Sequence, residues 1–273
     1  MRTVFTWFLA ATSALTVFAQ APAPAKSAIP RLANGKPDLT GVWQSATNRR
    51  GTWEEANSGT GVGGTGADPT APVVAASVDR QGRPGAPYQP WAAQKVLESF
   101  NRRAIDDPAA QCLPPGIPRL ASVGLFPIQI MQSPQQMIML FEYMNVFRVI
   151  PMNGKHPDDV EPSYLGDAVG RWEGDTLVVD VTGFNDKTWL IGAGTFHTES
   201  LHVTERFTRV SKDQIDYDAI MEDPKVLTKP WPFHTTFMLR EGTRLGEYAC
   251  AENNLDPGRY EKLLKDGVKI NRQ

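Results

Sequence analysis

The chain has 273 residues, 28 of them basic and 30 acidic, and its formal net charge is −2. It therefore lacks the basic excess that nucleic acids or anionic membranes attract, so we expect no nucleic acid partner and a small neutral or weakly charged ligand. A chain of this length can bury a sizeable core of its own.

The N-terminus is typical of a secretory signal peptide. Arg2 supplies a positive charge, the stretch from Val4 to Val17 is mostly apolar, and Ala19 is a small residue at a predicted cleavage point. We expect residues 1–19 to be removed and the mature protein to be periplasmic or secreted. The apolar stretch is too short to span a membrane, and we expect no membrane insertion.

The mature chain is predicted to form one unit. Residues 20–35 would be an N-terminal extension, and residues 36–273 a single β-rich domain that starts with a short strand in DLTGVWQS. Glycine and proline dominate residues 50–90, which we expect to be a long flexible insertion. Pro90 then precedes WAAQKVLESFNRRA, whose apolar residues recur at helical spacing.

From Phe126 onward the apolar pattern has a period of two, which is typical of β-strands separated by tight turns. The candidate strands are 126–132, 136–143, 145–152, 168–172, 176–183, 201–210, 214–221, 233–240 and 245–250. This pattern predicts a mainly β, antiparallel meander that is closed as a barrel or folded as a sandwich, and we favour a barrel-like fold with one helix.

Cys112 and Cys250 are the two cysteines of the chain. In an exported protein, such a pair is expected to form one disulfide rather than to supply a nucleophile. The bond would tie the segment before the first strands of the meander to the last predicted strand.

Side-chain parity places ionisable residues among apolar ones. In LHVTERF, Glu205 shares a face with apolar neighbours and His202 lies on the opposite face, and Asp180 interrupts a strand that is apolar on both sides. A buried carboxylate must be paired with a cation, hydrogen-bonded or protonated. One interpretation is structural: Glu142 and Arg148 on adjacent strands neutralise one another, and Glu205 pairs with Arg148 or another arginine, Arg171.

The other interpretation is catalytic. Glu205 and Asp180 would line a cavity with His197, whose loop lies directly before the strand of Glu205. A histidine that titrates near neutrality beside an oriented carboxylate is suited to general acid and base catalysis. His197, Glu205 and Asp180 are therefore the candidate catalytic residues, with Arg148 as a ligand or charge-stabilising group.

Two other histidines are candidates for ligand binding, together with Glu142 and Arg148. Parity predicts that His202 faces solvent, and His156 is expected to cap or pack a turn. The spacing of His197, His202 and Glu205 suggests a metal site, but parity separates the last two and the sequence has no HExxH motif. We expect no metal.

Several familiar motifs are absent. The sequence has no GxSxG, GxGxxG or GxxxxGK[ST] motif, so a serine α/β-hydrolase, a dinucleotide enzyme and a P-loop NTPase all lose support, and we expect no cofactor.

The blocks GKPDLTGVWQ, QCLPPGIPR, GRWEGDTLVVDVTGFNDKTWL and HTESLHVTERF together resemble a large family of exported, mostly uncharacterised bacterial proteins. The resemblance implies one unit that starts near Lys36, and it implies no substrate. Gly41-Val42-Trp43 also resembles the Gly-x-Trp at the first strand of lipocalins.

Two functions follow from these patterns. The first is an exported, cofactor-independent enzyme that acts on a small sugar-like or aromatic ligand by hydrolysis, elimination or isomerisation. The alternative is a noncatalytic lipocalin-like carrier or carbohydrate-binding module, in which the carboxylates form structural ion pairs. A structural envelope protein is a third reading.

Overall fold

The computed structural model describes residues 29–46, 86–102, 106–122, 126–192, 194–252, 258, 261–262 and 265–267. The predicted signal peptide and most of the predicted insertion at 50–90 lie outside the described residues.

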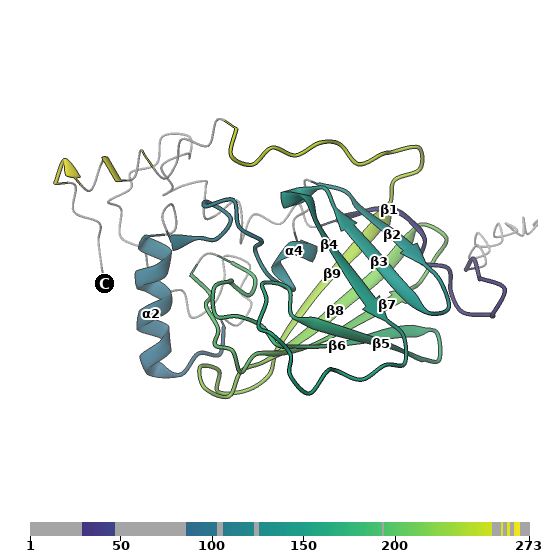
Figure 1. Ribbon diagram of the computed structural model, residues 1–273, viewed down its shortest axis with the longest axis horizontal. Coiled ribbons are helices and arrows are strands. Elements are labelled where there is room, and N and C mark those ends of the chain that lie inside the picture. Colours follow the sequence, from purple (N-terminus) through teal and green to yellow (C-terminus); the bar gives the residue numbers. More distant parts are fainter. Residues whose placement is uncertain are drawn as a thin grey trace, which may run out of the picture.

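One antiparallel sheet of nine strands dominates the described part of the chain (Figure 1). The strands are β1 (Gly41–Ser45), β2 (Ile128–Gln132), β3 (Gln136–Phe141), β4 (Val146–Pro151), β5 (Asp167–Glu173), β6 (Thr176–Thr182), β7 (His202–Arg209), β8 (Gln214–Glu222) and β9 (Trp231–Leu239). Their order in the sheet is β4-β3-β2-β1-β9-β8-β7-β6-β5, so eight of the nine candidate strands and the early strand are confirmed.

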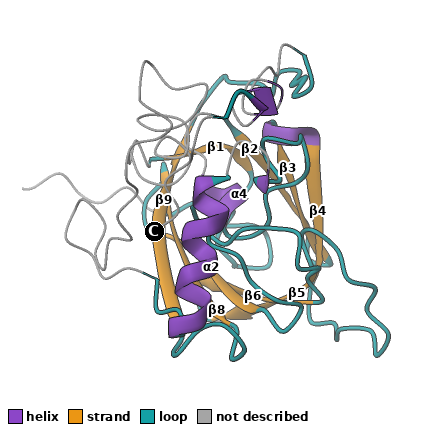
Figure 2. Ribbon diagram, turned by 90° about the vertical axis from the view of Figure 1, so that its left-hand side faces the viewer, coloured by secondary structure: helices purple, strands orange, loops and turns teal. Residues whose placement is uncertain are grey.

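The sheet curves into a nearly closed barrel, which confirms the barrel-like prediction (Figure 2). Its two edge strands, β4 and β5, meet at one point, where Met152 and Gly170 form a parallel bridge and the Asn153 amide donates to the Gly170 carbonyl at 2.6 Å. A Cβ on Gly170 would lie 2.8 Å from the Met152 sulfur, so the lack of a side chain permits this approach.

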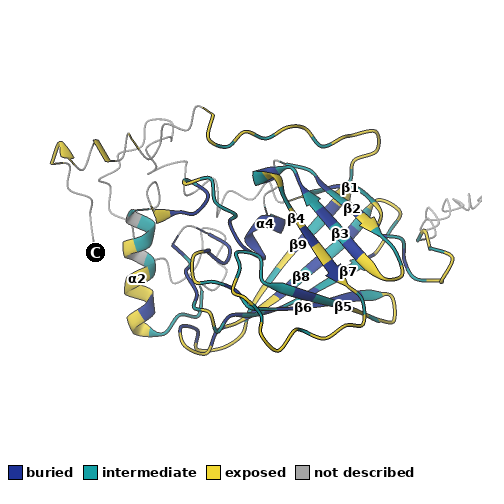
Figure 3. Ribbon diagram, in the orientation of Figure 1, coloured by how far each residue is buried: buried dark blue, intermediate teal, exposed yellow. Residues whose placement is uncertain are grey.

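Alternation of apolar and polar side chains explains why these segments form the barrel. Along β7, Val203, Glu205 and Phe207 are buried, while Thr204 and Arg206 between them are half-buried (Figure 3). In β7, one face therefore fills the interior and the other carries polar groups at the surface.

Two helices lie over one opening of the barrel (Figures 1 and 2). Helix α2 (Pro90–Asn101) confirms the predicted helix, with proline in its first turn. Helix α4 (Arg119–Ser122) is short, and Arg119 forms a buried two-bond ion pair with Asp107, at 2.7 Å for each bond. The proline-rich segment before α4 is also buried, so this end of the barrel is filled by irregular backbone rather than left open.

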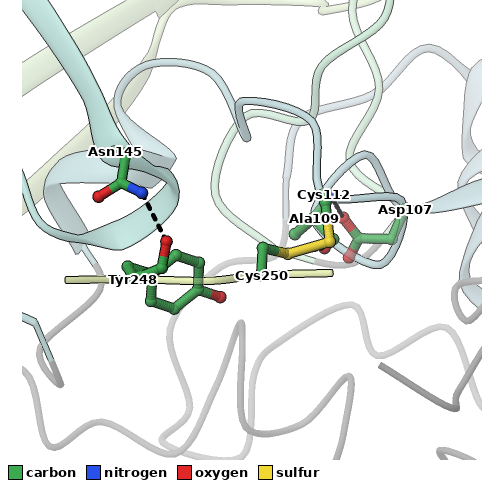
Figure 4. The surroundings of a disulfide bond; sticks show 6 residues. All are labelled: Asp107, Ala109, Cys112, Asn145, Tyr248 and Cys250. Atoms are coloured by element: carbon green, nitrogen blue, oxygen red, sulfur yellow. Dashed lines mark hydrogen bonds between the residues drawn. A yellow bond between two sulfur atoms is a disulfide. The ribbon is translucent and has the colours of Figure 1, made fainter. Parts of the chain in front are cut away.

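The predicted strand at 245–250 is wrong, because the sheet offers it no partner. Strand β9 already pairs with β8 and β1, and the two sheet edges face each other. Side chains hold this segment instead: Glu142 accepts from the Gly246 amide, and Asn145 of the 3-10 turn η1 (Tyr143–Asn145) donates to the Tyr248 carbonyl (Figure 4).

The predicted disulfide is confirmed. Cys112 and Cys250 are bonded, with their Cα atoms 5.5 Å apart (Figure 4). The bond joins the segment before α4 to the segment that follows β9, so it fastens irregular chain at the covered end of the barrel. No described helix is long and apolar enough to cross a lipid bilayer.

Candidate functional site

Glu205 lies inside the barrel and is held by two neighbours. Arg148 of β4 donates from its two terminal nitrogens to the two carboxylate oxygens, at 3.0 and 2.6 Å, and the Tyr217 hydroxyl of β8 donates to the same carboxylate at 2.8 Å. The side chains of Arg148 and Glu205 are 3% and 0% exposed. The structural interpretation of Glu205, an ion pair with Arg148, is therefore the one observed.

The electrostatics of this group favour a fixed ion pair over proton transfer. Burial opposes the charge on Arg148, but the neighbouring carboxylate of Glu205 outweighs it and raises the pKa of the guanidinium. Burial, and then the charge of Glu205, raise the pKa of Tyr217 well above its ordinary range. The guanidinium therefore stays charged and the phenol neutral, and neither exchanges protons near neutral pH.

His197 is also buried, in the loop between β6 and β7, with 2% of its surface exposed. Its Nδ1 lies 2.9 Å from the Thr198 carbonyl and its Nε2 lies 2.6 Å from the Thr188 hydroxyl. Because a carbonyl only accepts, Nδ1 carries the proton and Nε2 accepts from Thr188. Burial lowers the pKa of His197, so the ring is neutral and holds the loop together.

Asp180 lies on the outer face of the barrel. In the register of β6 and β7, Asp180 is paired with Thr204, whereas Glu205 is paired with Val179, so the two carboxylates lie on opposite faces of the sheet. The expectation that Asp180, Glu205 and His197 share one cavity is thus wrong. The sequence pattern could not settle this point, because Val178 on the outer face is also buried and the strand is apolar on both sides.

A chain of titratable side chains surrounds Asp180 on the outer face. His156 lies between Asp167 and Asp180, with its Nδ1 2.6 Å from one carboxylate and its Nε2 2.9 Å from the other. His202 of β7 approaches the second oxygen of Asp180 through its Nε2 at 2.7 Å, and its Nδ1 lies 3.4 Å from Glu222 of β8. His156 therefore contacts two carboxylates instead of capping a turn. His202 lies on the outer face, as parity predicts, but it is only half-exposed because it contacts Asp180 and Glu222.

The predicted ion pair between Glu142 and Arg148 does not form. Arg148 pairs with Met139 on the inner face of the sheet, whereas Leu140, two residues before Glu142, pairs with Phe147 on the outer face. Glu142 instead accepts from the Gly246 amide outside the barrel.

A cavity of about 340 Å³ lies at the seam between the two edge strands. We call it the seam pocket. The strands come together where Met152 meets Gly170, and the cavity lies nearer the other end of β4, at Phe147, Arg148 and Val149. Its lining is mostly apolar: Pro114, Phe147, Arg148, Val149, Ser163, Tyr164, Leu165, Gly166 and Ala168.

The lining of the seam pocket presents no unpaired charge in the part of the chain that is described. Arg148 is its charged member, and its guanidinium is turned inward to Glu205. Phe147 is 65% exposed and Val149 is 43% exposed, both on the outer face of β4. Sequence reasoning did not select either residue, although the parity that places Arg148 inward also places Phe147 and Val149 outward.

The described residues contain no group of three or more histidine, cysteine or acidic side chains arranged to hold a metal ion. The side chains around Asp180 contact one another in series, with His156 between Asp167 and Asp180 and His202 between Asp180 and Glu222. Comparison of the chain with protein-family models, with curated proteins and with solved structures gives no match. Over the described residues, the protein is a nearly closed, nine-stranded antiparallel barrel with a pocket at its seam.

Proposed function

We propose that this protein is a noncatalytic binder of a small, neutral, largely apolar organic ligand, which occupies the seam pocket. The observation that carries the proposal is the cavity of about 340 Å³ where β4 and β5 part, with its apolar lining and its one arginine engaged elsewhere. Cavities of roughly 300 Å³ and above are the usual sites for small molecules in proteins.

The side chains around the seam pocket indicate the chemistry of the ligand. Phe147 is 65% exposed, and covering it would contribute about 25 cal/mol for each Å² of apolar surface removed from water. An aromatic lining favours planar rings. The hydroxyl groups of Ser163 and Tyr164 can donate to or accept from one or two polar atoms. A phenolic compound fits this combination best.

A ligand inside the barrel, as in the lipocalin-like carrier predicted from the sequence, has less support. The rings of Phe207, Tyr217 and Phe237 lie against one another there, with centroids 5.0 to 6.3 Å apart, and all three are fully buried. The Arg148–Glu205 pair occupies the same interior. We therefore place the ligand at the seam.

The acid-base enzyme also has less support than the binder. A shared cavity was the basis of the catalytic assignment of His197, Glu205 and Asp180, and each has separate partners: Glu205 an arginine, His197 a threonine and Asp180 two histidines. The binder requires none of them to react.

Export to the periplasm or the medium is part of the proposal. The disulfide between Cys112 and Cys250 supports it, because such bonds form and persist in oxidising compartments.

The test is a thermal-shift screen of phenolics, sugars and lipids, followed by affinity measurements on two matched variants. Val149→Trp fills the seam pocket from β4, and Ile220→Trp makes the same change on the outer face of β8, where Ile220 is 38% exposed. A phenolic ligand should stabilise the wild type and Ile220→Trp and fail to stabilise Val149→Trp.

Two results would contradict the proposal. Equal ligand binding by Val149→Trp and Ile220→Trp would remove the seam pocket as the site. Turnover of the bound compound would show that the protein is an enzyme. Loss of that turnover on substitution of His156, His197 or Glu205 would identify the catalytic site.

A further inference from the structure

The wall of the seam pocket belongs to a loop that is fastened to the outer face of the barrel. Residues 152–166, which we call the seam loop, connect β4 to β5, and their last four members line the pocket. The Ser163 amide donates to the Gly183 carbonyl at 2.9 Å, and the Asn185 amide donates to the Ser163 carbonyl at 2.8 Å. A Cβ on Gly183 would meet Val160, so the middle of the loop packs closely on the end of β6.

His156 is the ionisable contact between the seam loop and the sheet. Its ring lies between Asp167, the first residue of β5, and Asp180 of β6, at 2.6 and 2.9 Å. Asp167 follows Gly166 directly, so one of the two carboxylates belongs to the residue between Gly166 and Ala168, which both line the pocket. The imidazole of His156 thereby links the start of the loop to its end.

Charged and titratable groups approach this contact from every neighbouring strand. Asp167 comes from β5 and Asp180 from β6, and Asp180 also binds His202 of β7, which in turn approaches Glu222 of β8. The other charged residues of the seam loop are exposed: Lys155, Asp158, Asp159 and Glu161.

The number of protons on His156 decides how many carboxylates it can bind. A protonated imidazole donates from both nitrogens, whereas a neutral imidazole donates from one and presents a lone pair at the other. Loss of the proton therefore leaves either Asp167 or Asp180 facing a lone pair. It also leaves both carboxylates charged around one neutral ring, and like charges at this range repel.

The electrostatic balance favours the protonated form. Burial opposes the charge on His156, but the hydrogen bonds to Asp167 and Asp180 outweigh it and raise the pKa of the imidazole above its ordinary value of 6.5. A raised pKa means that the stabilisation is fully present below 6.5 and is lost as the pH rises through the pKa of the folded protein. The contact is therefore fully formed below pH 6.5 and weakens as the pH rises through the raised pKa of His156.

We propose that His156 is a proton-controlled clamp on the seam loop, and that loss of its proton loosens the pocket wall and weakens ligand binding. This inference rests on the proposed function, because it assigns regulation to the same pocket. A wall that is already ordered costs less conformational entropy when the ligand binds, so the clamped state has the higher affinity.

The clamp is tested without any ligand by hydrogen exchange of the seam loop at about pH 6 and about pH 9, on either side of the ordinary histidine value and corrected for the intrinsic exchange rate. In the wild type, exchange should be faster at the higher pH. In His156→Gln, which carries no titrating proton, it should be fast at both. His234→Gln is the matched control, because His234 pairs with Asp218 at 2.7 Å on β9 and β8, away from the loop, and it should behave as the wild type.

The same three proteins are then used for affinity measurements with the phenolic compound from the thermal-shift screen. The affinity of the wild type and of His234→Gln should be at least about fivefold lower at the higher pH, since a factor of about five is the lower end of typical coupling between two sites. His156→Gln should bind weakly at both. If hydrogen exchange of the loop in the wild type does not change with pH, the clamp is overturned, whatever the ligand does.

Two further outcomes separate the clamp from the proposed function. If loop exchange changes with pH while the affinity of the wild type stays constant, the coupling between clamp and pocket is overturned and the binder stands. If loop exchange changes with pH and no compound binds at either pH, the proposed function is overturned together with the coupling, and the clamp itself stands.

Discussion

Removing the guanidinium of Arg148 would leave the carboxylate of Glu205 inside the barrel without its cation. The pair is bidentate, at 3.0 and 2.6 Å, and both side chains are almost completely shielded from water. In such a site, loss of one partner typically costs about 3–5 kcal/mol, because the remaining charge is neither solvated nor paired. We expect Arg148→Met to lower the free energy of unfolding by this amount.

A set of variants separates the unpaired charge from lost packing. Tyr217→Phe removes one hydrogen bond to a charged acceptor and should cost about 1.5–3 kcal/mol. The triple replacement of Arg148 by Met, Glu205 by Leu and Tyr217 by Phe removes all the polar groups together. Apolar replacement of a whole buried group is often neutral or stabilising, so the triple variant should recover most of the stability that Arg148→Met loses.

The assay is equilibrium unfolding in urea, monitored by tryptophan fluorescence. Variants whose m values equal that of the wild type are compared, because a shift of the midpoint then reports a change in stability alone. A loss smaller than about 1 kcal/mol in Arg148→Met would contradict this expectation, since it would mean that Glu205 reaches water or another cation. A triple variant as unstable as Arg148→Met would show that packing, rather than charge, accounts for the loss.

Two further predictions concern the covered end of the barrel. Replacing Cys112 and Cys250 together by Ala should lower the thermal unfolding midpoint, because the bond closes a loop of 138 residues, worth up to about 5 kcal/mol in the chain-entropy model; an unchanged midpoint would contradict this. Since burial lowers the pKa of His197, its NMR resonances should show a neutral ring with the proton on Nδ1. The free energy of unfolding should fall as the pH drops below 6.5, because the unfolded chain then binds a proton that the folded protein does not. His197→Gln should reduce this dependence of the free energy on pH. A His197 resonance that titrates at or above 6.5 would contradict the buried neutral ring.

Strand parity explains why much of the fold was predictable and part of the site was not. The alternation in LHVTERF placed Glu205 inside and His202 outside, and both positions are observed. Parity predicts which face of the sheet a side chain lies on, but it does not predict which residue that side chain contacts. Arg148 was one of two arginines proposed for Glu205, and the choice required the curvature that brings β4 close to β7, 57 residues later in the chain.

The carboxylate Asp180 shows the limit of the same reasoning. A strand that is apolar on both sides gives no preferred face, so its sequence could not place Asp180 outside with His156 and His202. His156 itself lies in a loop, where no periodicity constrains a side chain, and its two carboxylates come from different strands.

Local periodicity and residue type were enough to predict eight of the nine candidate strands of the meander, helix α2, the disulfide and the inward position of Glu205. The partners of the ionisable residues and the position of the seam pocket became known from the folded molecule. Both depend on how the sheet closes: β4 and β5 meet at Met152 and Gly170, the pocket lies between them nearer the start of β4, and no local sequence pattern records where two sheet edges separate.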